Sequence, residues 1–130
     1  MQKPEILRIK PRPAPRPRLG KNGAYNPSWY TQYKKDLVIL IKSLHIEKKD
    51  YNSLYVVFGL PYPKQVKGGQ DNKIEAAPHR IHSGDADNFM KGIKDAIQQA
   101  GIIEDDCQIF FETSCKVWTK TEGYIQFFLT

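Results

Sequence analysis

The sequence lacks the long apolar runs of a membrane protein. Its longest apolar stretches, 37–41 and 54–58, hold five residues each, whereas a membrane-spanning helix takes about 20. The N-terminal segment carries Lys, Arg and Pro but no apolar signal core. Cys107 and Cys115 are the only cysteines, too few for a disulfide framework, so free thiols in a reducing compartment are expected. We therefore expect a cytoplasmic protein.

The chain has the size and composition of one globular domain. It has 130 residues, of which 40% are hydrophobic and 26% charged. This composition excludes a wholly disordered chain, and the length is enough for one core but not for two. The sequence predicts a single domain over residues 1–130.

Positive charge exceeds negative charge, and the two are separated along the chain. The formal net charge is +6; residues 1–50 hold twelve basic and four acidic side chains, whereas residues 84–112 hold two basic and seven acidic ones. A basic segment followed by a compact acidic one suggests a polyanionic partner and a second task that needs carboxylates.

Apolar periodicity predicts two helices and four strands. Three- and four-residue spacing predicts helices over 27–44, with Asn26 as N-cap, and over 87–100, with Gly101 as the C-terminal cap. Strands are predicted over 5–10, 53–60 (buried on both faces), 107–118 and 124–129. The order β-α-β-α-β-β predicts an α+β domain, with two main helices on a mixed sheet of about four strands.

Two segments outside these elements are distinctive. Residues 10–21, the basic arm, combine a proline-rich extended run with five cations and no acid: Lys10, Arg12, Arg16, Arg18 and Lys21. These cations are expected to contact the phosphates of a polyanionic partner, although a charge run can also serve solubility alone. Residues 61–84 show no periodicity and are predicted to form a mobile surface loop.

Acidic residues flank the second predicted helix. Asp85 and Asp87 lie at its start, and a Glu-Asp-Asp run, 104–106, follows its end. Either aspartate at the start could simply cap free helix amides. Whether Asp106 faces Asp87 depends on how the next strand returns beside the helix, which the sequence leaves open. Asp95 is expected to pair with Lys91 or to stabilise local structure, and Glu104, Asp105 and Glu112 have no assigned role.

Converging carboxylates repel one another unless a cation lies between them. Oxygen ligands favour Mg²⁺, with Mn²⁺ as a substitute. On a chain that attracts phosphate, such a site points to metal-assisted phosphodiester hydrolysis. Lys91 follows Asp87 by four residues and shares its helix face; it either forms a surface ion pair or contacts the phosphate.

The acidic segment resembles the signature of RusA-type Holliday-junction resolvases. The matching residues are Asp85-Ala-Asp87-Asn88-Phe-Met-Lys91, Asp95-Ala96, Gly101-Ile-Ile and Asp105-Asp106-Cys-Gln108-Ile. The early Pro-Arg-Pro, the Tyr-rich helix and Lys116 on a strand are also similar to the family. The segment before Asp85 departs from the family's arginine-rich pattern, offering only Lys73, His79, Arg80 and His82.

The resemblance implies a small homodimeric endonuclease that cuts branched DNA with Mg²⁺, of the kind that bacteria and phages encode. It implies that Asp85, Asp87 and Asp106 bind the metal and that these three and Lys91 are catalytic. Arg80 and Lys116 join the basic arm as expected DNA contacts. The dimer surface is not evident; the segments 124–129 and 110–111 are candidates.

Two other hypotheses remain open. The first is a non-catalytic dimer that binds branched DNA, in which the acidic residues are helix caps and solvated charges. The second keeps the nuclease chemistry but changes the substrate to DNA flaps or forks.

Overall fold

The computed structural model describes residues 3–16, 18–62 and 85–130. Its main sheet has the strand order β1-β6-β4-β5, formed by β1 (Glu5–Leu7), β6 (Tyr124–Leu129), β4 (Ser53–Pro61) and β5 (Phe111–Thr119). β4 pairs in parallel with β5, and the β1–β6 and β4–β6 pairs are antiparallel. The predicted α+β class with a mixed four-stranded sheet is confirmed.

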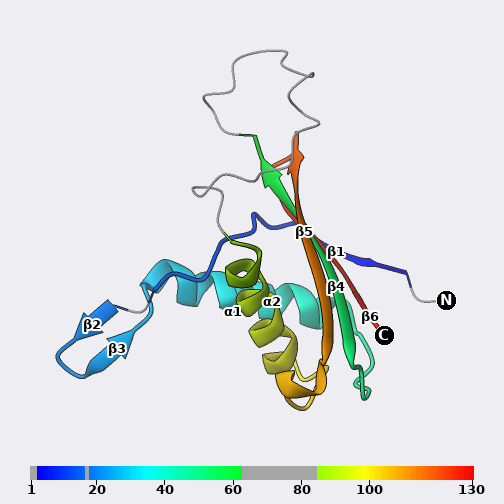
Figure 1. Ribbon diagram of the computed structural model, residues 1–130, viewed down its shortest axis with the longest axis horizontal. Coiled ribbons are helices and arrows are strands. Elements are labelled where there is room, and N and C mark those ends of the chain that lie inside the picture. The colour runs from blue at the N-terminus through cyan, green and yellow to red at the C-terminus, as the bar shows by residue number, and fades with distance from the viewer. Residues whose placement is uncertain (1–2, 17, 63–84) are drawn as a thin grey trace.

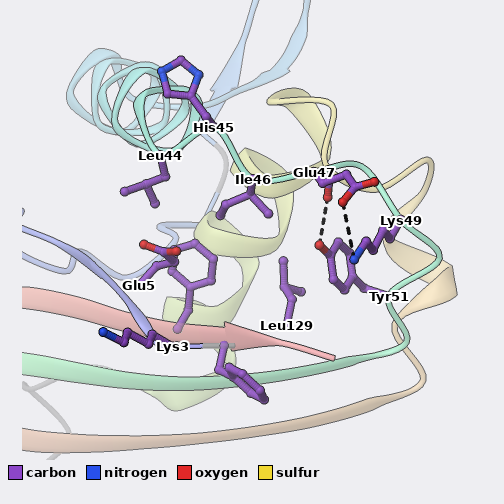
Figure 2. Close-up of a pocket in the computed structure, with 11 residues that line it drawn as sticks. Lys3, Glu5, Leu44, His45, Ile46, Glu47, Lys49, Tyr51 and Leu129 are labelled. Atoms are coloured by element: carbon purple, nitrogen blue, oxygen red, sulfur yellow. Dashed lines mark hydrogen bonds and ion pairs between the residues drawn. The ribbon is translucent and has the colours of Figure 1, made fainter. Parts of the chain in front are cut away.

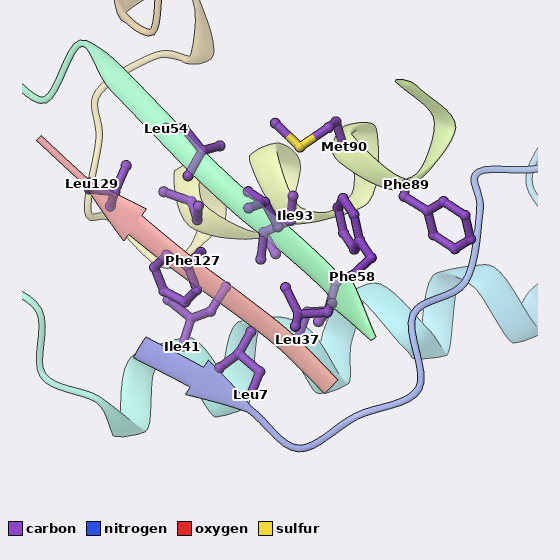
Figure 3. Close-up of a cluster of buried hydrophobic side chains, with 14 of the residues drawn as sticks. Leu7, Leu37, Ile41, Leu54, Phe58, Phe89, Met90, Ile93, Phe127 and Leu129 are labelled. Atoms are coloured by element: carbon purple, nitrogen blue, oxygen red, sulfur yellow. The ribbon is translucent and has the colours of Figure 1, made fainter. Parts of the chain in front are cut away.

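Two helices cover one face of this sheet (Figure 1). α1 (Ser28–Ser43) and α2 (Ala86–Gln99) bury the apolar stripes that their sequences predict. Leu37 and Ile41 of α1 and Ile93 of α2 meet Leu54, Phe58 and Phe127 of the sheet in one apolar core (Figure 3). Gly92 lies at the contact between the two helices, since a Cβ there would lie 3.4 Å from the Tyr30 hydroxyl and from the Tyr33 ring.

The helix ends follow the sequence at one helix and depart from it at the other. Gly101, just after α2, has φ +82°, a conformation that glycine adopts without strain. At α1 the N-cap is Pro27 with no side-chain capping bond, so the predicted Asn26 cap is wrong. Pro27 still contributes, because its carbonyl accepts bonds from the N–H groups of Tyr30 and Thr31.

Three further predictions are wrong in detail. Residues 18–25 form a small hairpin, β2 (Arg18–Gly20) and β3 (Gly23–Tyr25), where no strand was expected. Residues 106–108 form a 3₁₀ turn, η3 (Asp106–Gln108), and β5 begins only at Phe111. β4 is buried on its helix-facing side alone, since Tyr55 on the other side is 40% exposed. Both cysteines are free thiols, as predicted.

Candidate active site

The start of α2 presents two exposed carboxylates. Asp85 occupies the N-cap position and Asp87 lies in the first turn. The Asp85 carbonyl accepts bonds from the N–H groups of Asn88 and Phe89, but its side chain makes no capping bond. The capping hypothesis therefore fails for Asp85, and the carboxylate is left available for a ligand.

The basic arm is fixed beside these carboxylates. The N–H of Ala14 donates to the carbonyl of Asn88 at 3.0 Å, which holds the arm against the first turn of α2. The guanidinium of Arg12 lies 4.1 Å from the centre of the Trp29 ring, a cation–π contact that orients it. Lys10, Arg12, Arg16 and Lys21 are all exposed. The middle of the arm, at Ala14, thus lies against the turn that carries the acidic pair.

Two lysines lie near the same end of α2. Lys91 is exposed, one turn after Asp87, and forms no ion pair with any residue of the described part of the chain. Lys116 lies on the helix-facing side of β5, in register with Phe58, whose ring packs 5.3 Å from that of Phe89. Cations are therefore positioned around the acidic pair from a helix and from a strand.

The direction of β5 explains the place of Lys116. Glu112 pairs with Lys94 of α2 at 2.9 Å, and β5 runs from there toward the start of α2 (Figure 1). Four residues of strand cover about 13 Å, while the seven residues from Lys94 back to Asp87 cover about 10 Å. Lys116 is therefore level with the first turn of α2.

Asp106 lies at the opposite end of α2. Its N–H donates to the Gln98 side chain at 3.1 Å, and Gln98 follows Asp87 by eleven residues, about 16 Å of helix. Within a single chain Asp106 is thus not brought to Asp85 and Asp87. Among residues 3–16, 18–62 and 85–130, no three His, Cys, Asp or Glu side chains are grouped closely enough to hold a metal ion.

The neighbours of Asp106 have structural roles. The Asp105 carboxylate accepts the Cys107 N–H at 2.9 Å and caps η3, and this bond lowers the pKa of Asp105. The Gln108 side chain donates to the Tyr51 carbonyl at 2.9 Å and accepts the Glu104 N–H at 2.9 Å. Asp105 and Gln108 therefore build the turn.

The other acids are engaged in ion pairs. Asp95 pairs with Lys34 of α1 at 3.5 Å, so its predicted pairing with Lys91 is wrong, although a local structural role holds. Glu104 pairs with Lys48, which lowers the pKa of Glu104. Tyr30, at the start of α1, is buried, and its ring lies 6.0 Å from that of Tyr33.

Some residues singled out in the sequence lie outside the part of the chain that the structure describes. Arg80, Lys73, His79 and His82 lie outside the described residues, as do positions 63–84 of the loop predicted over 61–84, whose first residue, Pro61, ends β4. The side chain of Arg18 is also not described. His45 follows the C-cap of α1, with φ +53°.

A separate pocket of about 230 Å³ lies between the end of α1 and strands β1 and β6 (Figure 2). In its wall Tyr51 donates to the Glu47 carbonyl at 2.8 Å, and Lys49 pairs with the Glu47 carboxylate at 3.5 Å. None of the predicted site residues lines this pocket, so it is not part of the candidate site.

No described helix is both long and apolar enough to cross a lipid bilayer.

Comparison with known proteins gives one family. Residues 8–126 match the family model described as endodeoxyribonuclease RusA. This match covers the basic arm, both helices and all of β4 and β5. No curated protein matched the chain.

Proposed function

The chain belongs to the RusA endodeoxyribonuclease family, and from that premise we propose that it is a Mg²⁺-dependent nuclease that resolves Holliday junctions by paired, symmetric cuts. Enzymes of this family are metal-dependent endonucleases of DNA junctions. One observation carries the proposal. Two exposed carboxylates, Asp85 and Asp87, lie at the start of α2, and the basic arm is held against the same helix turn by the bond from Ala14 to Asn88.

Asp85 and Asp87 fit a magnesium site. Mg²⁺ is commonly held by one or two carboxylates together with substrate phosphate and water, and these two side chains are exposed at a helix start. When bound, the ion would polarise the scissile phosphate and supply hydroxide at neutral pH. Mn²⁺, which takes the same oxygen ligands, would substitute.

The basic side chains of the protein would bind the phosphates of the DNA. In our proposal Lys91 contacts the scissile phosphate and offsets negative charge that develops during cleavage. The basic arm, with Arg80 and Lys116, holds the flanking backbone and sets the DNA in register with the acidic pair.

Asp106 belongs to the proposal as a third carboxylate. Because its backbone is held by Gln98, its side chain would reach the other two aspartates only through a second copy or a rearrangement of η3. The variant Asp106→Asn, assayed beside Asp87→Asn, measures whether Asp106 takes part in cleavage.

The proposed enzyme acts as a homodimer. One chain presents one pair of carboxylates at α2, whereas a four-way junction is resolved by cuts on two opposed strands. A twofold dimer supplies two related centres.

The test uses a labelled four-way junction with either Mg²⁺ or EDTA. We expect the wild-type protein to cut the junction only with Mg²⁺ and the variant Asp87→Asn not to cut it. The variant should still bind the junction, because a negative charge near the phosphates has been removed. Asp50→Asn removes the same charge from an exposed loop residue and should cut normally. Equal cutting by Asp87→Asn would refute the site.

Flap and fork substrates complete the assay. Junction resolution predicts that the four-way junction is cut faster than either of them under the same conditions. A preference for flaps or forks would keep the nuclease chemistry but replace the substrate. Binding of all branched DNA with no cutting at any metal concentration would favour a binding module.

A further inference from the structure

The β2–β3 hairpin stands out from the rest of the protein. Figure 1 shows it on the side of the helices, beyond the start of α1 and away from the main sheet. Every residue from 19 to 26 is exposed, including all of β3. A two-stranded hairpin of this length is only marginally stable in water on its own. A partner that covers the hairpin would therefore add to its stability.

One apolar side chain of the hairpin is almost fully exposed. Leu19 is 89% exposed, more than any other large hydrophobic residue in the described part of the chain. It pairs across the strands with Ala24, whose methyl group covers little of it. The Tyr25 ring belongs to the opposite face and lies over Gly20, where a Cβ would be 3.0 Å from it. Leu19 is thus presented to whatever the hairpin contacts.

The charges on and around the hairpin favour DNA as its occupant. Between Glu5 and Asp36 the sequence holds eight Lys and Arg residues and no acidic one. Lys21 is exposed at the tip, between the paired Gly20 and Gly23. Because these glycines carry no side chain, the tip is slender and its backbone can approach a sugar–phosphate chain closely. Two-stranded ribbons of this kind fit into DNA grooves.

The hairpin lies within reach of the proposed cleavage site. The N–H of Ala14 is bonded to Asn88, next to Asp87, and Leu19 follows Ala14 by five residues. Five residues of extended chain span at most about 18 Å, or about five nucleotide steps of roughly 3.4 Å. Cuts that turn a four-way junction into two duplexes lie at or close to its branch point. A junction held at the carboxylates therefore has its branch point in the range of the hairpin.

We propose that Leu19 inserts between bases at the branch point and makes the protein prefer branched over linear DNA. The proposal rests on the proposed function and adds the residue that selects the substrate. Apolar side chains, Leu among them, act as wedges between base steps in DNA complexes, at the cost of unstacking the bases. This cost is lower at a branch point, where strands pass from one arm to another, than within a continuous duplex.

Leu19 and the cations around it would act on different quantities. The cations contact phosphates, which every DNA presents, so they set the affinity for all DNA and its dependence on salt. Leu19 carries no charge. It would set the ratio of junction affinity to linear-duplex affinity and leave the salt dependence unchanged.

The test measures binding in EDTA, without cleavage, to a four-way junction and to a linear duplex. Each DNA carries the fluorescent base 2-aminopurine, at the branch point or at the centre of the duplex. Wild-type protein should prefer the junction and raise the emission at the branch point, because the base is unstacked there. Leu19→Ala should bind the junction about tenfold more weakly, bind the duplex as tightly as wild type, and leave the emission low.

Three further variants serve as controls. Leu19→Met keeps an apolar side chain of similar volume and should retain the preference and the emission change. Ile39→Ala shortens an apolar residue of α1 that is 65% exposed and should alter neither. Lys21→Gln, at the tip of the same hairpin, should weaken binding to both DNAs and lower the slope of log affinity against log salt by about 1, with the junction preference kept.

The outcomes that would overturn the proposal are specific. A wild-type protein without junction preference, a Leu19→Ala variant that keeps the preference and the emission change, or one that loses affinity for both DNAs equally would each refute the role of Leu19. These measurements do not involve cleavage. A protein that cuts junctions without using Leu19 would keep the nuclease assignment and lose this one, and a protein that shows the Leu19-dependent emission but never cuts would do the reverse.

Discussion

The N–H of Ala14 donates to the carbonyl of Asn88 at 3.0 Å. This bond joins the basic arm to the helix turn that carries Asp85 and Asp87, two segments about seventy residues apart in the chain. In the proposed function, DNA bound along the arm would be led to the carboxylates. The bond would then let a small chain combine a phosphate-binding segment with a cluster of negative charge that would otherwise repel DNA.

The arm's contribution can be measured from the salt dependence of junction binding. If its five cations contact phosphates, affinity should fall roughly 10²- to 10³-fold between 50 and 200 mM salt. The double variant Arg16→Gln, Lys21→Gln should lower the slope of log affinity against log salt by about 2. The same change at Lys35 and Lys42 of α1 is the control. A wild-type response that is nearly flat would remove the arm from the DNA surface.

Replacement of Lys91 should affect cleavage and not folding. Lys91→Ala is expected to slow junction cleavage roughly 10²-fold, the scale for loss of one charge-stabilising donor. The side chain is exposed, so the free energy of unfolding should stay within about 0.5 kcal/mol of the wild-type value. Lys35→Ala, on α1, should alter neither quantity. Unfolding of Lys91→Ala would instead assign Lys91 a structural role.

Gln108 should matter for stability in its own right. Its side chain joins the 104–108 turn to the loop before β4 through bonds to Glu104 and Tyr51. Gln108→Ala removes two hydrogen bonds, one exposed and one partly buried, and should lower the free energy of unfolding by about 1 kcal/mol. Gln99→Ala, at the exposed end of α2, is the matched control for chemical denaturation. Equal stability of the two variants would contradict the structural role.

Stability should decline in strongly alkaline solution. Burial raises the pKa of both Tyr30 and Tyr33 from 10.0 to about 12, and the charge of Asp95 adds to the effect at Tyr30. The fold favours the neutral phenols, so their contribution is complete below pH 10 and is lost as pH rises from 10 toward 12. Denaturant midpoints across this range, with phenolate absorbance, measure the loss.

Phenylalanine variants identify the responsible groups. Tyr30→Phe and Tyr33→Phe should each remove one late-titrating phenol and weaken the alkaline decline. Tyr25→Phe, at a residue 52% exposed on β3, should leave the decline unchanged. A wild-type protein whose tyrosines all titrate together near pH 10 would contradict this prediction.

Local patterns predicted much of the fold. The apolar stripe of α2 and the positive-φ glycine that follows it were both readable because they depend on residues within one turn of each other. The β2–β3 hairpin also had a local signal, Asn22-Gly23, of which Asn22 lies in the turn and Gly23 begins β3 with φ +104°. Its strands are only three residues each, too short to show alternation.

The position of Asp106 could not be predicted in the same way. It depends on the direction of β5 relative to α2, which is fixed by pairing with β4 some 58 residues earlier in the chain, as in the Ser53–Phe111 pair. The one-sided burial of β4 was missed for a related reason. An apolar run in a strand indicates that both faces of the strand avoid water. It does not indicate what covers the second face, which can be helices of the same chain or another molecule.

The place of β6 has a consequence for assembly of the domain. Although it is the last of the four sheet strands in the sequence, β6 lies between β1 and β4. During synthesis the earliest strand has no neighbour until the latest one has emerged. Contacts of such wide sequence separation slow folding, so acquisition of the native sheet should be a late, concerted event after translation of residues 124–129.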